Sequence, residues 1–242
     1  ATISYEIEKI QKRYMPDSVS VEAERHVKED FLEQYFCDLR PQEKFSYLVN
    51  TLKKEDSEKV IIFCSARNTV ELISHNLKKH GFKNMMIHGK LSQNQRLKVI
   101  NEFNHGKTDI LIASAVAARG LDIKFVTHVI NYDLSPDPQE YVHRVGRTAR
   151  AGEKGKAITL LCDRDYQTFN QILDRYATLD VKEVPKGEFA KLTFETRMGN
   201  SRRSFGQGGR GNRFSGRGNH RSNSGGRSSG YQGHSGNRQR SF

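Results

Sequence analysis

The sequence predicts an α/β fold in which a parallel β-sheet is flanked by helices on both faces. The first observation is a series of short apolar segments, rich in β-branched residues, with the character of buried strands: residues 60–64, 85–87, 110–113, 126–130 and 157–161. The second is amphipathic helical spacing between most of these segments. Short apolar strands that alternate with helices are typical of a parallel sheet buried on both faces. Such sheets bind ligands at the carboxyl ends of their strands.

Residues 1–29 are predicted to be an appendage to this fold. Apolar residues three or four positions apart predict one short helix: Ile3, Ile7, Ile10 and Tyr14. Pro16 ends this helix, and Val19 and Val21 then alternate as in a short strand. These pieces contain too little apolar surface to fold alone.

The predicted body of the fold extends from residue 30 to residue 184. Its first helix is marked by apolar residues on one face: Phe45, Leu48, Val49 and Leu52. Further helices are expected at residues 68–79, 92–104, 137–145 and 165–176. Ser92 and Gln95 have the spacing of a capping box, and Gly81 is suited to the C-cap of the helix before it.

Residues 185–242 are predicted to form a disordered tail. From about Gly199 the composition is dominated by Gly, Arg, Ser and Asn, which cannot bury enough apolar surface to offset the ordering entropy. The chain carries a formal net charge of +12, and residues 196–242 contain ten arginines and no Asp, Glu or Lys. A tail of this charge favours a nucleic acid partner over a membrane.

Cysteine and hydropathy patterns exclude several classes of protein. Cys37, Cys64 and Cys162 are far apart and form no Cys-x-x-Cys pair, so we expect no disulfide framework and no metal site. Reduced thiols fit a cytoplasmic protein. No apolar run approaches the roughly 18 to 20 residues that span a bilayer, and no membrane partner is expected. The chain begins with Ala1 rather than Met, which suggests a fragment.

Two segments of the body concentrate chemically active residues. One is Ala118-Arg119-Gly120-Leu121-Asp122, and the other is His143-Arg144-Val145-Gly146-Arg147-Thr148-Ala149-Arg150. Three arginines and a histidine within eight residues are costly inside a domain unless anions neutralise them. If the second segment is partly helical, Arg147 and Arg150 share one face of the helix.

These segments resemble motifs V and VI of the DEAD-box RNA helicases. Three further elements of that family have counterparts at Val60–Ser65 (motif IV), His88-Gly89 and Gln93-Asn94-Gln95-Arg96. The chain departs from the family at Lys90, where Asp is usual, and at Ser114-Ala115, where Thr-Asp is frequent. The resemblance covers nearly all of residues 1–184. It implies that residues 1–29 are the end of the first helicase domain and the interdomain linker, and that residues 30–184 are the C-terminal RecA-like domain of an ATP-dependent RNA helicase, joined to an Arg/Gly-rich tail.

The resemblance implies a role for individual residues. Arg147 and Arg150 would act as arginine fingers on the phosphates of ATP, and Asp122 with Gly120 would hold its ribose. Arg119, His143 and Arg144 would face the other helicase domain. RNA would be contacted by residues of the body and of the tail: Gly89, Arg96, Ser114, Arg210, Arg213 and Arg217. The partners would be RNA, ATP and the N-terminal RecA-like domain, which would hold the Mg²⁺ of ATP. Phe205, Phe214 and Tyr231 would add stacking on bases.

Two glycine-rich matches do not carry chemistry. Gly106-Lys107-Thr108 resembles the end of a phosphate-binding P-loop, but Asn101 stands where that loop requires Gly, and the segment leaves a predicted helix to enter a strand. Residues 206–211 satisfy G-x-G-x-x-G within the predicted tail, with no strand before them. Because the sequence contains no P-loop, we expect this chain to be inactive on its own. The alternatives are a stand-alone RNA-binding or annealing module without ATPase activity, and a related helicase that acts on DNA.

Overall fold

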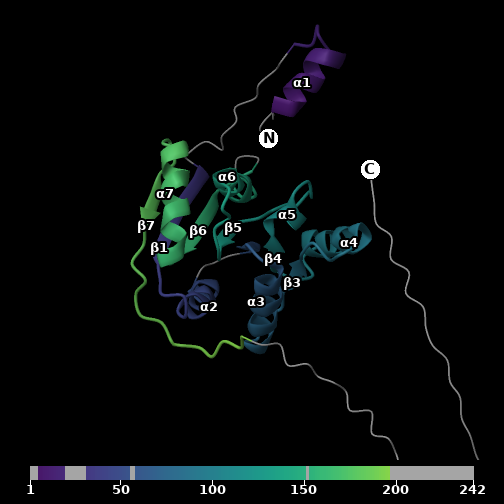
Figure 1. Cartoon of the computed structure of the whole chain (residues 1–242). Coiled ribbons are helices and arrows are strands. Elements are labelled where there is room, and N and C mark those ends of the chain that lie inside the picture. Colours follow the sequence, from purple (N-terminus) through teal and green to yellow (C-terminus); the bar gives the residue numbers. More distant parts are fainter. Residues whose placement is uncertain (1–4, 20–30, 55–57, 151–152, 197–242) are drawn as a thin grey trace, which may run out of the picture. The chain divides into compact units, whose positions relative to one another are not determined.

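The computed structural model describes residues 5–19, 31–54, 58–150 and 153–196, and the fold is given for these residues (Figure 1). Seven parallel strands form one sheet in the order β3-β4-β2-β5-β6-β1-β7. The strands are β1 (Leu32–Asp38), β2 (Val60–Cys64), β3 (Met85–Ile87), β4 (Ile110–Ser114), β5 (His128–Asn131), β6 (Gly155–Leu161) and β7 (Val181–Glu183). The predicted α/β class with a parallel sheet is confirmed.

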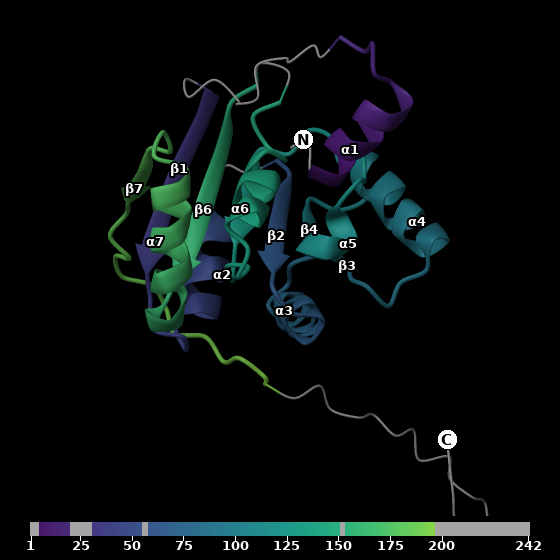
Figure 2. The ribbon, with the colours of Figure 1, turned by 45° about the horizontal axis from the view of Figure 1, so that its top comes forward.

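One face of the sheet packs against four helices. They are α4 (Gln93–Asn104), α5 (Ala115–Ala118), α6 (Pro138–Val145) and α7 (Tyr166–Arg175). Figure 2 shows α6 and α7 in front of β6 on this face. Alternate residues of each strand point here, such as Ile61 and Phe63 of β2, which are buried with Phe103, Val145 and other residues of these helices.

The opposite face packs against α2 (Lys44–Lys54) and α3 (Arg67–Lys79). The other residues of β2, Val60, Ile62 and Cys64, are buried there with Ile73 and Leu77 of α3. All five residues of β2 are therefore buried, which explains why this strand is continuously apolar rather than alternating.

Local signals set several of the helix ends as predicted. Ser92 and Gln95 form a complete capping box at the start of α4. Gly81 follows α3 with a φ of +88°, a left-handed conformation that only glycine adopts without cost. Asp137 caps α6 by accepting a hydrogen bond from the backbone N–H of Gln139 at 3.0 Å.

Two strands were not predicted. β1 contains Glu33, Gln34 and Asp38 and so lacks an apolar run, yet it is paired on both sides, by β6 and by β7. Gln34 is tolerated inside the sheet because its side-chain oxygen accepts a hydrogen bond from the Tyr141 hydroxyl at 3.1 Å. β7 has three residues, which are too few to show an alternating apolar pattern.

The N-terminal helix is α1 (Tyr5–Tyr14), and the chain turns at Pro16 as predicted. Ile10 and Tyr14 are more than half exposed, which agrees with a segment that has too little apolar surface to fold alone. Val19 lies outside any strand, and Val21 lies outside the described residues. No helix among the described residues is long and apolar enough to cross a membrane.

The folded body continues past Val184, where the sequence placed its end. Phe189, Leu192 and Phe194 pack against the α2–α3 face of the sheet. Glu195 exchanges two hydrogen bonds with Asn76 of α3, one from its N–H at 2.8 Å and one to its carbonyl at 3.0 Å. This strap of residues 185–196 lacks regular secondary structure, so sequence periodicity could not reveal it. The rest of the predicted tail, residues 197–242, lies outside the described residues.

We predict that the strap contributes to the stability of the domain. A chain that ends at Val184 should lose about 2–4 kcal/mol of unfolding free energy relative to a chain that ends at Thr196, because the apolar side chains of α2 and α3 become exposed. Urea denaturation of the two chains measures the difference. Equal midpoints and slopes would show that the strap packs without contributing to stability.

Candidate nucleotide and RNA sites

Segments 119–127 and 146–150 meet at the amino ends of β5 and β6, where Thr127 accepts from the backbone N–H of Lys156 and Gly155 lies against Thr148. Segment 119–127 leaves α5 and enters β5 at His128, and segment 146–150 leaves α6 on the way to β6 at Gly155. The residues that the sequence assigns to ATP, Asp122, Gly120, Arg147 and Arg150, therefore lie away from the carboxyl edge of the sheet. These residues therefore do not lie where the general expectation for parallel sheets places a ligand, because both segments are return connections that precede a strand.

Three hydrogen bonds join the two segments, and we call them the 126–148 junction. Arg147 Nη1 donates to the carbonyl of Leu121 at 3.1 Å. The buried Thr148 hydroxyl donates to the carbonyls of Val126 at 2.6 Å and Thr127 at 3.0 Å. The space around Thr148 is closed by Gly155, since a Cβ at that glycine would lie 2.3 Å from Thr148 Oγ1.

Strained backbone occurs in the same two segments. Phe125 has a φ of +58° and Ala149 a φ of +52°, and no other non-glycine residue in the described part of the chain has a positive φ. Such conformations cost about 1–3 kcal/mol each and persist where the surrounding contacts determine them. Ala149 is buried beside the junction, and its turn separates Thr148, which points inward, from the exposed Arg150.

Arg147 and Arg150 are close, but not through a shared helix. α6 ends at Val145, so both arginines follow it in a turn, and Arg150 Nε donates to the carbonyl of Gly146 at 2.8 Å. Partial burial lowers the pKa of Arg147, and repulsion from Arg150 lowers it further. Neither guanidinium has a carboxylate partner among the described residues. Two adjacent cations without an acid nearby form a site suited to a polyanion.

Asp122, Gly120 and Arg119 lie in the neighbouring loop. The Asp122 side chain is 73% exposed, and Lys124 Nζ lies 3.2 Å from it. Gly120 turns the chain with a φ of +70°. Arg119 is half exposed and forms an ion pair with the buried carboxylate of Glu140 on α6. Asp122 is thus available to a hydroxyl of a ligand, and Arg119 is held at the surface by α6.

His143 lies on α6, between these two groups of residues. The ring is partly exposed. Burial lowers its pKa below the usual 6.5, and Arg119 and Arg147 lower it further by repulsion. A neutral imidazole at a partly exposed position can donate or accept one hydrogen bond at a surface.

Arg144 does not face another domain. Only 2% of this residue is exposed, its Nη1 donates to the carbonyl of Asp133 at 2.7 Å, and its guanidinium lies 5.5 Å from the ring centre of Phe63. Burial lowers its pKa to about 10. The interdomain role expected for Arg144 is therefore corrected. The motif places this arginine under α6, where it ties the helix to the end of β5.

The residues that the sequence assigns to RNA in the body lie at the opposite edge of the sheet. Ser114 ends β4, and Gly89 follows the end of β3. Arg96, in the first turn of α4, donates to the carbonyl of Gly89 at 3.3 Å, and its Nε is buried without a hydrogen-bond partner. The structure thus brings Gly89 and Arg96 together at the carboxyl edge. Arg210, Arg213 and Arg217 lie outside the described residues.

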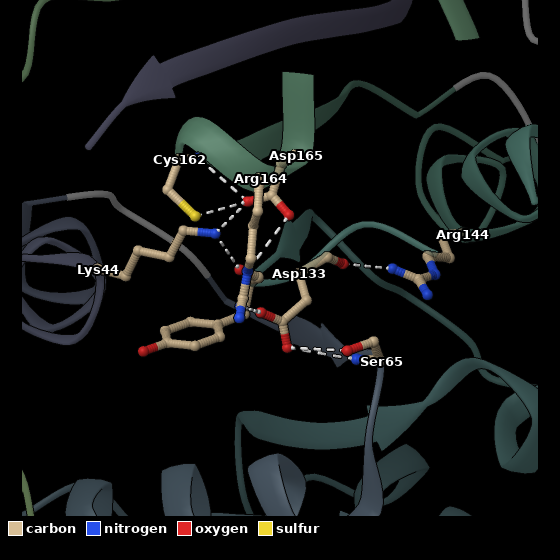
Figure 3. Close-up of polar contacts among 8 residues, drawn as sticks. Lys44, Ser65, Asp133, Arg144, Cys162, Arg164 and Asp165 are labelled. Carbon is tan, nitrogen blue, oxygen red and sulfur yellow. Dashed lines mark hydrogen bonds and ion pairs between the residues drawn. The ribbon is translucent and has the colours of Figure 1, made fainter. Parts of the chain in front are cut away.

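A buried ionic cluster fixes the carboxyl ends of β2, β5 and β6, as Figure 3 shows. Lys44 of α2 is buried, with its Nζ 2.6 Å from Asp165 and 3.2 Å from the carbonyl of Tyr132. Asp165 also accepts from the backbone N–H of Cys162 at 3.1 Å. In the same cluster, Asp133 accepts from the Ser65 hydroxyl at 3.3 Å and from Arg164 at 3.0 Å.

Sequence reasoning missed the residues that position the site. Lys44, Asp133 and Asp165 of the cluster, Glu140 beside Arg119 and Thr148 at the junction have roles that appear only once distant segments meet. Thr148 and Gly155 were detectable only as members of a longer motif. All three cysteines are free and buried, and burial raises the pKa of each thiol.

Comparison with known proteins agrees with this geometry. Residues 43–152 match the family described as helicase conserved C-terminal domain. The ATP-dependent RNA helicase CshA of Listeria monocytogenes is 41% identical over 167 residues, which are 68% of this chain and 32% of that protein. The ATP-dependent RNA helicase RhlB of Psychromonas ingrahamii is 37% identical over 166 residues, 68% of this chain and 40% of that protein.

Solved structures give the same result. The C-terminal domain of the DEAD-box protein Dbp5 has a TM-score of 0.61 at 31% identity, covering 66% of this chain and 93% of that one. A DEAD box protein of Methanococcus jannaschii has a TM-score of 0.61 at 38% identity, covering 76% of this chain and 49% of that one. The body is thus a helicase C-terminal domain with the RecA-like fold. The chain belongs to the DEAD-box family. It spans 32% to 47% of the length of the first five curated relatives that it matches.

We predict that Lys44→Ala destabilises the domain by about 3–5 kcal/mol, because Asp165 would remain buried without its cation. Urea denaturation measures the loss. The double variant Lys44→Met with Asp165→Leu should recover much of it, since the lone charge is then removed. A single variant as stable as the parent protein would show that the cluster is hydrated rather than dry.

A second prediction concerns His143, which should remain neutral at pH 7. Because its pKa is lower in the folded protein than in the unfolded chain, its contribution to stability is complete above about pH 6.5. It is lost as the pH falls through the folded pKa. Titration of the ring by NMR should give a midpoint below 6.5, and His143→Gln should flatten the dependence of unfolding free energy on pH below that value. A midpoint above 6.5 would contradict the assigned environment.

Proposed function

We propose that the complete protein is an ATP-dependent RNA helicase to which this chain contributes the second RecA-like domain. The observation that carries this proposal is the 126–148 junction, which joins a loop with an exposed carboxylate to two arginines that have no acid partner in the described part of the chain. That combination suits a ribose hydroxyl and a polyphosphate. The curated relatives that the chain matches are named ATP-dependent RNA helicases, which supports the same reading.

ATP would bind against segments 119–127 and 146–150, with its other side on a preceding RecA-like domain. Asp122 would accept a hydrogen bond from the ribose, and Gly120 allows close approach of the backbone. Arg147 and Arg150 would stabilise charge on the phosphates as the terminal phosphoryl group is transferred to water, which is the role of an arginine finger. We assign the Mg²⁺ of ATP to the preceding domain. No group of three or more His, Cys, Asp or Glu side chains that suits a metal is present among the described residues.

RNA would bind at the carboxyl edge of the sheet. The guanidinium of Arg96, which lies beside Gly89, and the exposed backbone at Gly89 would supply donors for a phosphate. Ser114 would add a hydroxyl, while Ala115 has no polar group to offer. A solved structure of S. cerevisiae Dbp5, with a TM-score of 0.67 at 29% identity, is described as bound to RNA and ADP BeF3, which supports one fold holding both ligands.

α6 would couple the two edges. Near its beginning, Glu140 holds Arg119, and near its end Arg144 holds the carbonyl of Asp133 at the end of β5. The arginines of segment 146–150 follow directly. A shift of α6 produced by closure on a preceding domain would therefore move Arg119, the end of β5 and the arginines of segment 146–150 together. Arg119 and His143, which are partly exposed, would contact that domain.

The tail would tether RNA without reading its sequence, through Arg210, Arg213, Arg217 and its other arginines. A cytoplasmic location remains a prediction that is supported by the free thiols. The two alternatives are separated by activity: a stand-alone RNA-binding or annealing module hydrolyses no ATP, and a DNA helicase is stimulated by DNA. Measuring the ATPase rate of the complete protein with each nucleic acid tests all three readings.

We predict that Arg150→Ala in the complete protein lowers kcat for RNA-stimulated ATP hydrolysis by roughly 10³-fold, with a smaller effect on ATP binding. Arg147→Ala should behave similarly. Steady-state kinetics at saturating RNA measure both. Arg175→Ala, an exposed arginine of α7 that lies over Tyr176, is the matched control. Near-normal turnover in both site variants would rule out the finger assignment.

We predict that residues 197–242 supply most of the RNA affinity of this chain. Removing them should weaken binding and flatten its salt dependence, because fewer counterions are then released from RNA. Fluorescence anisotropy on two unrelated RNAs over a salt series compares the full chain with one that ends at Thr196. If affinity and salt slope are unchanged, the RNA site lies on the body.

A further inference from the structure

We infer that Phe125 is a platform on which the base of the bound nucleotide stacks. The inference rests on the proposed function, since it places the base beside the ribose and phosphate residues. Phe125 is 75% exposed and lies three positions after Asp122 in the same loop. Large apolar side chains are ordinarily buried where the backbone permits it, so its exposure requires an explanation.

The backbone holds Phe125 outward. Ile123 and Val126, on either side, are buried in the core. The side-chain amide of Asn104 donates to the carbonyl of Asp122 at 2.9 Å and accepts from the N–H of Lys124 at 3.1 Å, so the loop is fixed from below. Phe125 itself adopts a φ of +58°, which is unusual for an aromatic residue. The ring is therefore presented in one direction by a rigid loop.

One side of this ring is already occupied. Lys59 Nζ lies 5.4 Å from the centre of the Phe125 ring and 5.6 Å from that of Phe103, and it donates to the carbonyl of Asn104 at 2.9 Å. This ammonium packs against Phe125 as a cation–π contact. Since Phe125 is 75% exposed within the described part of the chain, the ring still has surface for a flat group.

A nucleobase fits this surface better than a protein does. Phe125 is one exposed aromatic residue, and the exposed charged side chains of Asp122 and Lys124 precede it in the same loop, so the loop is not the continuous apolar patch that docks a protein. A base has a π face and a polar edge, which suits a ring bordered by charges. If Asp122 holds the ribose, the base attached to that ribose lies within reach of a residue in the same turn. Because every base has a π face, the contact adds affinity without selecting adenine.

The test uses the complete helicase at saturating RNA. Phe125→Ala should raise KM about tenfold for ATP and for GTP alike, with kcat nearly unchanged, because stacking on the base is lost equally in ground and transition states. Ribose 5-triphosphate, which lacks a base, should inhibit the parent and the variant with the same Ki. Tyr14→Ala is the matched control, since Tyr14 is also an exposed aromatic residue with a cation over its ring.

A second variant reports the contact directly. This chain contains no tryptophan, so Phe125→Trp adds a fluorophore that should be quenched by ADP and not by ribose 5-triphosphate. The inference is overturned if Phe125→Ala leaves KM unchanged, or if the Ki of ribose 5-triphosphate rises in parallel with KM, which would mean that the ring contacts protein. The variant Asp122→Asn distinguishes failure of this inference from failure of the proposed nucleotide site. Should Asp122→Asn weaken ATP binding while Phe125→Ala does not, this inference alone fails. Should neither do so, the proposed nucleotide site itself fails.

Discussion

The buried hydroxyl of Thr148 holds together the two segments that form the proposed nucleotide site. Its hydrogen bonds to the carbonyls of Val126 and Thr127 join segment 146–150 to segment 119–127, which is distant in the sequence. Gly155 is required beneath it, because any side chain there would collide with Thr148. With the two connections joined, the strained turns at Phe125 and Ala149 are maintained, and Arg147, Arg150 and Asp122 are presented on one edge without ordering cost at the moment of binding.

The two edges of the sheet differ in how their charged side chains are paired. At the carboxyl ends of β5 and β6, Lys44 is matched by Asp165 and Arg164 by Asp133, so the charges stabilise one another within the domain. At the amino ends, Arg147 and Arg150 have no such partner among the described residues. Among the described residues, charges are thus paired at the carboxyl edge and left unpaired at Arg147 and Arg150. α6 connects the edges, because Glu140 and Arg144 lie on it and segment 146–150 continues from it.

The strands and helices of the body were largely predictable from sequence, because β2, β4 and β6 are buried on both faces and α2, α3 and α4 have clear apolar periods. β1 was missed since its polar residues are satisfied by partners such as Tyr141 that no local pattern reveals. The strap of residues 185–196 was missed since it packs without any period. Within the site, the motif residues were found by resemblance, but their placement was not. Arg144 lies in the interior, and the residues that the resemblance assigns to ATP lie in return connections, whose course through the fold no local pattern predicts.

We propose that nucleotide and RNA occupy opposite edges of this one domain and that α6 links the two edges. Amide hydrogen exchange of the complete protein, measured with a non-hydrolysable ATP analogue alone, RNA alone and both together, tests it most directly. The nucleotide should slow exchange in residues 119–127 and 146–150, and RNA should slow exchange in residues 88–96 and 114–118. Protection of α6 should be greatest when both ligands are present. Protection of residues 88–96 by the nucleotide alone, or of residues 146–150 by RNA alone, would contradict it.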